Sequence, residues 1–408
     1  MSLGGKMRGS RGRRLSVRIL IAVLIAGLAL FVVRHGAAAV TRRADPSRAV
    51  ALAPWDARAR AARAEALLRD GMTPANNVRT EQLARRALLR DATNVSAAAT
   101  LGFVVQLRDP VRAEQLFRYA EGLSRRELRT QIWMIENAVV KGQVQEALRH
   151  YDVALRSSSS APALLYPALA VAIADPFIRR SLIDVLRRRP AWSESFLRGV
   201  SINGPDFAAA AALLTELRAG GIASPAEAIA NLSASLAARG DYGRAWRLFA
   251  DGTPGVSRLR IRNGSFTTGD FTASPFNWLV GNDGGFSAAI QGEPEGVLNI
   301  EASPTVGGVA VKQLQLLPPG RYRLSTRVRN VAQPAESRPY WTIACASGRE
   351  LSRVQIGQAG EKGAIFADEF IVPSDCAAQW LSLTIVPSDL PEGVSMLVDD
   401  VKIQQVRT

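Results

Sequence analysis

The sequence contains little histidine and cysteine, and this scarcity excludes several kinds of active site. Its 408 residues include two histidines, His35 and His150, and neither lies beyond residue 256. A Ser-His-Asp or Cys-His catalytic group is therefore ruled out in that last section. No HExxH, CxxC, GxxxxGK[ST] or GxSxG motif occurs anywhere in the chain. We expect a protein that is not an enzyme, although the sequence leaves open a pair of converging carboxylates.

Lysine is also scarce, and arginine carries most of the positive charge. The formal net charge is +15, from 51 Lys+Arg and 36 Asp+Glu. Residues 1–18 hold six cations and no acid, whereas residues 257–408 hold 14 cations and 15 acids, so the remaining excess lies in 19–256. This excess fits an anionic partner such as an acidic polysaccharide, or else a compositional bias toward Arg and Ala. No segment resembles a helix-turn-helix, a zinc finger or an RNA-binding strand, so we expect no nucleic-acid partner.

A long apolar run follows the basic N-terminus. Residues 19–33, ILIAVLIAGLALFVV, carry no charge, and the run continues if Arg34 extends its guanidinium to the membrane interface. We expect an uncleaved transmembrane anchor at 19–40 behind a cytoplasmic tail at 1–18, because basic residues stay inside. A cleaved signal peptide ending in the alanines at 37–39 is the alternative. Both place the remaining chain outside the cytoplasm, and the composition leads us to expect a bacterial inner-membrane protein with its bulk in the periplasm.

The two cysteines, Cys345 and Cys376, both lie in the last section of the chain. An even number in an exported domain favours a disulfide between them. Closing a separation of 31 residues would stabilise the fold by about 3–4 kcal/mol in the chain-entropy model. Two buried thiols are the alternative.

Between residues 44 and 256 the apolar residues recur every three or four positions, which predicts helices. Asp-Pro pairs at 109–110 and 175–176 predict an N-cap followed by a first-turn proline. Capping boxes are predicted at two further places, Ser124 with Glu127 and Ser224 with Glu227.

The helical section also repeats a pattern of small and aromatic residues about every 34 positions. The positions that carry the pattern are Gly102, Ala113, Phe117, Ala147, Tyr151, Ala245 and Phe249. The pattern resembles tetratricopeptide repeats over 61–156 and 226–252, and it fades in 157–225, where we expect degenerate helix pairs. The resemblance implies an α-solenoid at 44–256 whose concave surface holds a peptide or a partner protein, and a plain spacer is the alternative.

After about residue 257 the apolar period changes from 3.6 to 2. In GRYRLSTRVRN the residues from Tyr322 to Val328 alternate with arginines, and QWLSLTIV turns Trp380 away from the face of its three buried aliphatic residues. Short strands separated by Gly, Pro and Asn turns predict an antiparallel β-sandwich.

Three motifs in this section, IRNGSF…PFNW, LLPPGRYRLSTRVR and MLVDDVKI, resemble those of jelly-roll carbohydrate-binding modules and their galactose-binding-like relatives. The matching positions are Asn263, Gly264, Phe266, Trp278, Pro319, Gly320, Tyr322, Leu324, Ser325, Asp399, Asp400 and Val401. The resemblance covers residues 257–408 and implies a jelly roll. Four aromatic residues near its start are then expected in the core: Phe266, Phe271, Phe276 and Trp278.

Relatives of this kind often bind a structural calcium ion between the first and last strands, where Asp399 or Asp400 could supply an oxygen. The acidic residue expected after Phe266 is replaced by Thr267 and Thr268. We therefore expect no cofactor, with structural calcium as the alternative.

Residues that contact a ligand must lie on outward faces or loops. Sugars stack on exposed aromatic rings, and the best placed rings are Trp380, Tyr340 and Trp341. Guanidinium groups along one strand face could bind the carboxylates of an acidic glycan, and these are Arg321, Arg323, Arg327 and Arg329. A solvated sheet face, charged against aggregation, is the alternative.

Taken together, the sequence predicts a multidomain α and β protein: a transmembrane helix, a solenoid of the tetratricopeptide kind and a C-terminal jelly roll. We expect a non-enzymatic envelope scaffold that supports surface-polysaccharide assembly or export. The solenoid would bind a protein and the jelly roll a glycan. The alternative is a protein-protein adaptor with no sugar binding.

Overall fold

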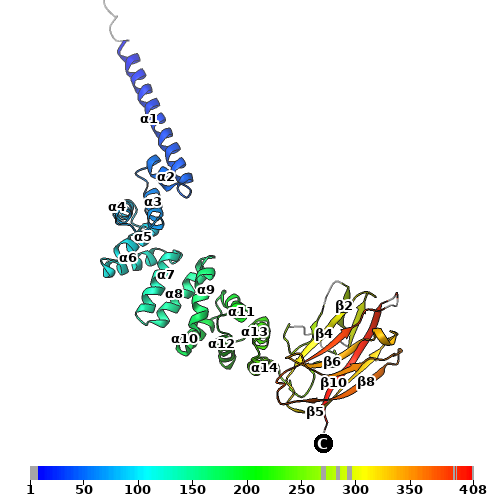
Figure 1. The fold of residues 1–408 in the computed structure, drawn as a ribbon. Helices are drawn as coiled ribbons and strands as arrows, with labels where there is room; N and C mark the ends of the chain where they lie inside the picture. The colour runs from blue at the N-terminus through cyan, green and yellow to red at the C-terminus, as the bar shows by residue number, and fades with distance from the viewer. Residues whose placement is uncertain are drawn as a thin grey trace, which may run out of the picture. The chain divides into compact units, whose positions relative to one another are not determined.

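The structure is a computed structural model that describes residues 8–267, 273–281, 285–291, 296–388, 391 and 393–406. The chain divides into two compact units, Met1–Leu165 and Tyr166–Thr408. The second unit contains the last helices together with the described strands (Figure 1).

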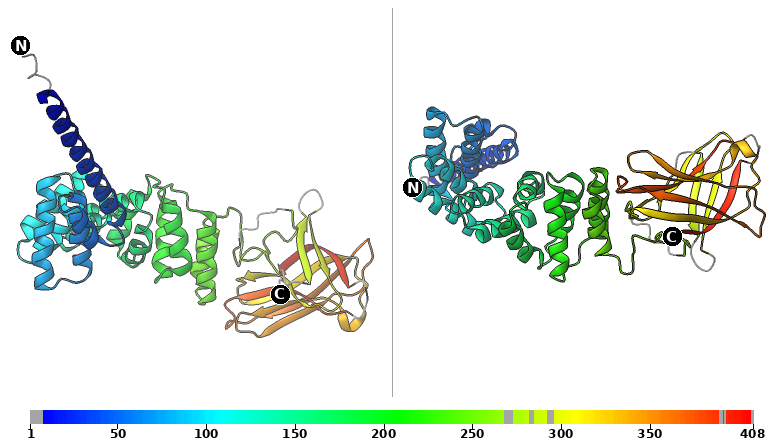
Figure 2. Two further views of the ribbon diagram at one scale, coloured as in Figure 1. Left: turned by 90° about the horizontal axis from the view of Figure 1, so that it is seen from above. Right: turned by 60° about the horizontal axis from the view of Figure 1, so that its bottom comes forward.

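Fourteen α-helices are described, and many of them pack in pairs along the chain (Figure 2). The most extensive pairs are α3 with α4, α5 with α6, α7 with α8, α4 with α5 and α13 with α14. The bounds are α1 Arg8–Thr41, α2 Pro46–Leu52, α3 Ala57–Arg69, α4 Pro74–Arg90, α5 Val95–Val105, α6 Pro110–Leu123, α7 Leu128–Val140, α8 Val144–Ser157, α9 Ala161–Ala172, α10 Pro176–Leu186, α11 Ser193–Asn203, α12 Phe207–Ala219, α13 Ala226–Ala238 and α14 Tyr242–Ala250.

Helix α1 contains the apolar run. Within the described residues its stretch Val17–Thr41 is long and apolar enough to cross a membrane, as a signal sequence would also be. The side chains of 19–33 are exposed, whereas Arg34 donates from Nε to the carbonyl of the last residue of α2 at 3.0 Å. Ala38 is fully buried in a cluster with alanines of α2 and α3. The last turns of the predicted anchor at 19–40 therefore pack against protein.

The Asp-Pro pairs start helices as predicted. The side chain of Asp109 accepts a hydrogen bond from the Arg112 N–H, and that of Asp175 accepts one from the Phe177 N–H. Each aspartate is followed by a proline in the first turn, where the missing N–H costs no helical hydrogen bond.

The two predicted capping boxes are absent. Glu127 is itself the N-cap of α7 and accepts from the Thr130 N–H. The N-cap of α13 is Pro225, and no side chain caps that helix. Both predictions placed the helix start too early, because Ser124 ends α6 and Ser224 precedes the proline.

Small residues let the paired helices approach closely, as the repeat pattern predicted. Gly102 faces the fully buried ring of Phe117, and a Cβ on Gly102 would lie 2.8 Å from that ring. The Phe117 ring is held by a stack on Trp133, with the ring centroids 4.1 Å apart. Ala113 and Ala147 are buried in the neighbouring helices. A larger side chain at these positions would push the helices apart.

Degenerate helix pairs were expected over 157–225. In this stretch α9 carries Pro167 in its interior, and an interior proline removes one helical hydrogen bond, so α9 is an irregular helix. The lengths of α9 to α12, 11 to 13 residues, match those of α3, α5 and α7 and do not test the expectation.

Ten described strands form two antiparallel five-stranded sheets. The first sheet has the order β1-β4-β9-β6-β7 and the second sheet the order β2-β3-β10-β5-β8. The bounds are β1 Leu279–Val280, β2 Phe286–Gln291, β3 Val297–Ala302, β4 Gly308–Gln315, β5 Gly320–Arg329, β6 Tyr340–Cys345, β7 Glu350–Gln355, β8 Ala364–Val372, β9 Gln379–Ile385 and β10 Val394–Gln405.

One hydrophobic core fills the space between the two sheets. On β5 the residues Tyr322, Leu324, Thr326 and Val328 are buried and the arginines between them point outward. The strict alternation on β5 and β9 confirms the period of two and the predicted sandwich. Cys345 and Cys376 form the predicted disulfide.

The Asn-Gly motif that opens the section packs on the last strand. Asn263 has a φ of 50°, in the left-handed region. Gly264 lies so close to β10 that a Cβ there would overlap the carbonyl oxygen of Val401, whose N–H donates to the Gly264 carbonyl at 2.8 Å. Only glycine permits this approach, so the motif is a structural one.

Two of the four aromatic residues expected in the sandwich core lie there. Phe266 and Trp278 pack together with their ring centroids 5.4 Å apart. Phe276 instead contacts two aromatic rings of α14, at centroid distances of 5.2 and 5.1 Å. Its assignment to the sandwich core was wrong, because the chain before β1 runs along α14. Phe271 and Thr268 lie outside the described residues.

Candidate functional site

The predicted ligand residues lie on two different sheets. Trp380 is on β9 and Tyr340 on β6, both in the first sheet, whereas the arginines are on β5 in the second sheet. In a sandwich the outward faces of the two sheets point in opposite directions. The aromatic and the guanidinium groups therefore form two separate surfaces.

Trp341 is a correction to the predicted set. It is fully buried in the sandwich core, with its ring centroid 5.8 Å from that of Trp278. Strand alternation means that two adjacent residues, Tyr340 and Trp341, cannot both face outward. Trp341 therefore offers no ring face to a ligand.

The outward residues of β6 and β9 line up through the register of the two strands. Tyr340 pairs with Thr384, Thr342 with Ser382, and Ala344 with Trp380. Two rings thus lie four residues apart along the sheet, about 13 Å at the usual rise. The hydroxyls of Thr342 and Ser382 lie in the row between them. We call these four residues, Tyr340, Thr342, Trp380 and Ser382, the aromatic strip.

A cation flanks each side of the aromatic strip. Lys312 on β4 pairs with Ser382, and Arg353 on β7 pairs with Thr342. The Lys312 Nζ lies 5.1 Å from the ring centroid of Trp380, and the Arg353 Cζ lies 4.4 Å from that of Tyr340. The aromatic strip offers two partly exposed rings and two hydroxyls, and each ring has a hydrogen-bond-donating cation over one of its faces.

A cavity of about 330 Å³ adjoins the Trp380 end of the strip, inside the second compact unit. The residues that line it come from α13, α14 and the first sheet with its preceding segment, and they are Ala234, Ala237, Ala238, Tyr242, Ala273, Pro275, Leu279, Ala346 and Trp380. One side of the Trp380 indole thus faces a recess rather than open solvent.

The arginines of β5 are mostly paired with acidic residues. The Arg321 Nε lies 2.9 Å from a carboxylate oxygen of Glu369. Arg327 and Arg329 share Asp399, at 3.7 and 3.5 Å. Burial raises the pKa of Asp399, and the two guanidinium groups oppose that shift. Only Arg323 has no acidic partner in the described part of the row, so this face carries little uncompensated charge.

The surroundings of the Asp399 carboxylate argue against the alternative of a structural calcium ion. Asp399 faces two guanidinium groups, an arrangement that disfavours a bound cation. Within the described residues no three His, Cys, Asp or Glu side chains converge as a metal site.

The helical array carries an apolar groove of about 400 Å³ that sequence reasoning missed. Its walls come from α9, α11 and the residues after α11, and they are Tyr166, Pro167, Ala170, Val171, Phe196, Gly199, Val200, Asn203, Gly204 and Pro205. A Cβ added to Gly199 would meet nothing within 4 Å, so the space above α11 is open. Pro167 and Gly199 are poor helix formers that mark this place in the sequence.

No family model matches the chain, and no curated protein matches it. Among solved structures, a CBM4 module is 15% identical with a TM-score of 0.29, and the match covers 36% of this chain and 99% of that one. The CBM22-1 xylan-binding domain from Paenibacillus barcinonensis is 16% identical with a TM-score of 0.26, covering 37% and 95%. YrrB, a TPR protein with an unusual peptide-binding site, is 16% identical with a TM-score of 0.26, covering 50% and 88%.

At these scores the matches describe a likeness of fold and decide nothing about ligands. The helix pairs and the order of strands in the two sheets are themselves those of the predicted fold, a tetratricopeptide-like array followed by a jelly roll.

Proposed function

We propose that the protein is a non-enzymatic scaffold of the bacterial envelope that holds a protein partner on its helical array and a glycan on its sandwich. The single observation that carries the glycan half is the aromatic strip, where two rings about 13 Å apart flank a row of two hydroxyls and two cations.

The chemistry of the strip suits a sugar chain. Aromatic faces stack on the C–H faces of pyranose rings, and hydroxyl and cationic donors bond the sugar hydroxyls between them. Lys312 would also attract carboxylates of an acidic glycan. Arg353 adds less charge, because Glu350 already accepts hydrogen bonds from its Nε at 3.0 Å and its Nη2 at 2.8 Å. The β5 arginines contribute less, because acidic neighbours already pair with most of them.

The N-terminal helix and the disulfide support a location outside the cytoplasm. Disulfides persist in oxidising compartments, and an exposed apolar helix behind a basic segment orients the chain with its basic end inside. We assign the chain to the inner membrane as a single-pass protein with the bulk in the periplasm. There it would support assembly or export of a surface polysaccharide.

The protein-binding half relies on the apolar groove between α9 and α11. Its walls are mostly aliphatic and aromatic, and Gly199 leaves room for an inserted side chain. A partner segment of a neighbouring envelope protein would bury its apolar side chains there.

Affinity electrophoresis tests the glycan half. The full chain in mild detergent is run in native gels that contain a neutral or an acidic polysaccharide. We expect retardation by at least one polysaccharide, and Trp380→Ala should weaken the apparent affinity about tenfold through loss of stacking. Arg323→Gln, on the opposite sheet, is the matched control and should leave retardation by a neutral polysaccharide unchanged.

The competing function is a protein-protein adaptor whose sandwich docks on another envelope component without sugar. Absence of retardation by every neutral and acidic polysaccharide would favour that adaptor. Equal losses in the Trp380 and Arg323 variants would also count against the aromatic strip as the binding surface.

A further inference from the structure

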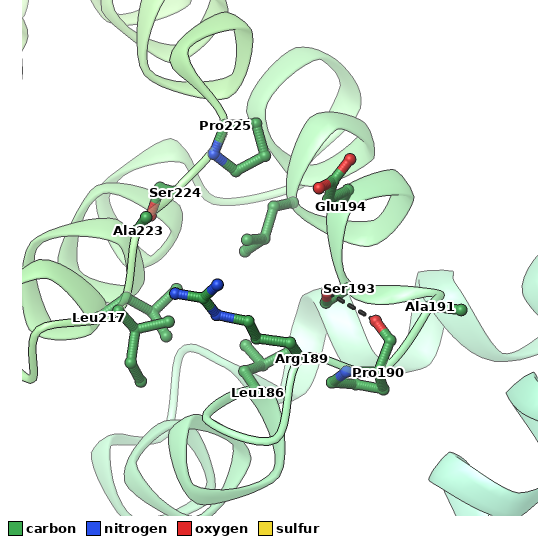
Figure 3. Close-up of a pocket in the computed structure, with 12 residues that line it drawn as sticks. Leu186, Arg189, Pro190, Ala191, Ser193, Glu194, Leu217, Ala223, Ser224 and Pro225 are labelled. Atoms are coloured by element: carbon green, nitrogen blue, oxygen red, sulfur yellow. Dashed lines mark hydrogen bonds between the residues drawn. The ribbon is translucent and has the colours of Figure 1, made fainter.

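A second cavity in the helical array has a different character from the apolar groove. It measures about 300 Å³ and lies where the α10–α11 connection meets the α12–α13 connection (Figure 3). The lining residues are Leu186, Arg189, Pro190, Ala191, Ser193, Glu194, Leu197, Leu217, Ile222, Ala223, Ser224 and Pro225. All of them belong to the second compact unit.

Arg189 supplies the charge of this cavity. Figure 3 shows its guanidinium extending into the open space, with the carboxylate of Glu194 on the far side. In the described part of the chain Arg189 has no ion pair or side-chain hydrogen bond. Its backbone has a φ of 49°, which glycine adopts at lower cost, and Pro190 follows directly.

The other polar groups of the cavity are mainly donors. The Ser224 Oγ is buried and has no hydrogen-bond partner among the described residues. Helices α11 and α13 both begin at this cavity, and neither has a side-chain cap for its first N–H groups. Ser193 is already engaged, because its N–H and its hydroxyl both donate to the Pro190 carbonyl, at 2.9 and 2.7 Å, so the free donors of α11 are those that follow it. An acceptor with negative charge is the ligand group that these donors lack.

The remaining wall is aliphatic. Leu186, Leu197, Leu217 and Ile222 line the cavity and are themselves buried. A ligand that fills this space therefore needs an apolar side chain beside its charged group. This combination is a property of a peptide rather than of a sugar, whose hydroxyls would face an aliphatic wall.

We propose that this cavity binds a carboxylate of a protein partner, set beside an apolar side chain, with Arg189 as the residue that recognises the charge. The proposal deepens the protein-binding half of the proposed function, because it names the chemistry of the partner segment. Glu194 disfavours a second negative charge at the far side and thus limits the partner to one carboxylate at this place.

Calorimetry on the full chain in lipid nanodiscs tests the proposal with short peptides. The acidic probe is acetyl-Leu-Asp-Leu-amide, and acetyl-Leu-Asn-Leu-amide is its neutral match. Acetyl-Leu-Ala-Leu with a free C-terminus distinguishes a terminal carboxylate from a side-chain carboxylate. We expect the neutral peptide to bind at least tenfold more weakly than one or both of the carboxylate peptides.

Four variants locate the site. Arg189→Gln should weaken binding of the carboxylate peptide about tenfold. Arg188→Gln removes the same charge from a neighbour that is also exposed but does not line the cavity, and it should change binding less than twofold. Arg189→Gly should also weaken binding, yet raise the melting temperature, which separates binding from folding. Glu194→Gln should tighten binding severalfold.

Equal binding of the acidic and neutral peptides would overturn the proposal. Equal losses from the Arg188 and Arg189 variants would do the same, since they would show attraction to net charge alone. A Gly199→Trp variant fills the apolar groove and separates the proposed function from the Arg189 proposal. If this variant no longer binds the envelope partner, while binding of the carboxylate peptides still depends on Arg189, both proposals are supported. If the Gly199→Trp variant no longer binds the partner and the peptides bind independently of Arg189, the proposed function is supported and the carboxylate proposal is refuted.

Discussion

Removal of the disulfide should cost the sandwich a large part of its stability. Cys345 ends β6, and Cys376 lies in the connection before β9. The 31 residues of separation enclose β7 and β8, which are edge strands of the first and the second sheet. The bridge thus joins the end of β6, in the first sheet, to the connection that leads from β8 of the second sheet to β9 of the first. We therefore expect its loss to destabilise both sheets.

The magnitude follows from the length of the enclosed loop. In the chain-entropy model a loop of about 31 residues loses about 12 cal/mol/K, or about 3.7 kcal/mol at 25 °C. Both cysteines are almost fully buried, and alanine leaves only a small gap in their place. The free energy of unfolding of the double variant Cys345→Ala/Cys376→Ala should therefore fall by about 3–4 kcal/mol.

Urea unfolding monitored by tryptophan fluorescence measures this difference, because Trp278 and Trp341 lie in the sandwich core. Wild-type protein in reducing buffer is the control and should match the double variant within about 1 kcal/mol, since both lack the bridge. A loss below about 1 kcal/mol would refute the loop-entropy reasoning and show that the reduced chain keeps β7 and β8 in place by other contacts.

Three further changes test the packing and the charges of the helical array. Gly102→Ala should lower the free energy of unfolding by about 1–2 kcal/mol, because the clash of the new methyl group with the fixed ring of Phe117 outweighs the gain in helix propensity. Gly122→Ala, which has open space around it, is the control and should be neutral or stabilising. Equal effects of the two variants in urea unfolding would contradict this. Burial lowers the pKa of His150, so stability should be constant above its ordinary pKa of 6.5 and fall as the pH drops below it; a His150→Gln variant should lack that fall between pH 7 and 5. Arg189→Gly should raise the free energy of unfolding by about 1 kcal/mol, and a decrease would show that the arginine side chain holds the cavity together.

Much of the architecture can be predicted from local patterns of the sequence. The change of period near residue 257, the Asp-Pro helix starts and the alternation around Tyr322 each depend on neighbours within a few positions. The contact of Gly102 with Phe117 can also be predicted from the sequence, because a repeat of 34 residues places a small residue opposite an aromatic one in each helix pair. These features need no knowledge of distant contacts.

The candidate surfaces depend on distant pairing and were predicted only in part. Trp380 was placed outward correctly, but the row that joins it to Tyr340 follows from the register of β6 with β9, which no local pattern reveals. The acidic partners of the β5 arginines, such as Asp399, come from other strands for the same reason. The prediction that Trp341 faces a ligand together with Tyr340 was wrong, and strand alternation alone excludes it, since adjacent strand residues face opposite sides.

Phe276 illustrates a second limit. Its aromatic ring and the Asn-Gly motif upstream both suggest the sandwich core, and it is indeed fully buried. The partners that bury it are rings of α14, in a section of the chain with a different period. Hydrophobic pattern predicts that a residue is buried, but it does not say against which element.

The central claim is that the outward face of the first sheet, rather than that of the second, takes a glycan. Hydroxyl-radical footprinting of the full chain, with and without a polysaccharide that retards it in gels, tests this most directly. We expect Tyr340 and Trp380 to lose reactivity in the presence of the polysaccharide, and Ile365 and Ile371, which are exposed on the second sheet, to keep theirs. Unchanged reactivity of both rings, or protection confined to the two isoleucines, would contradict it.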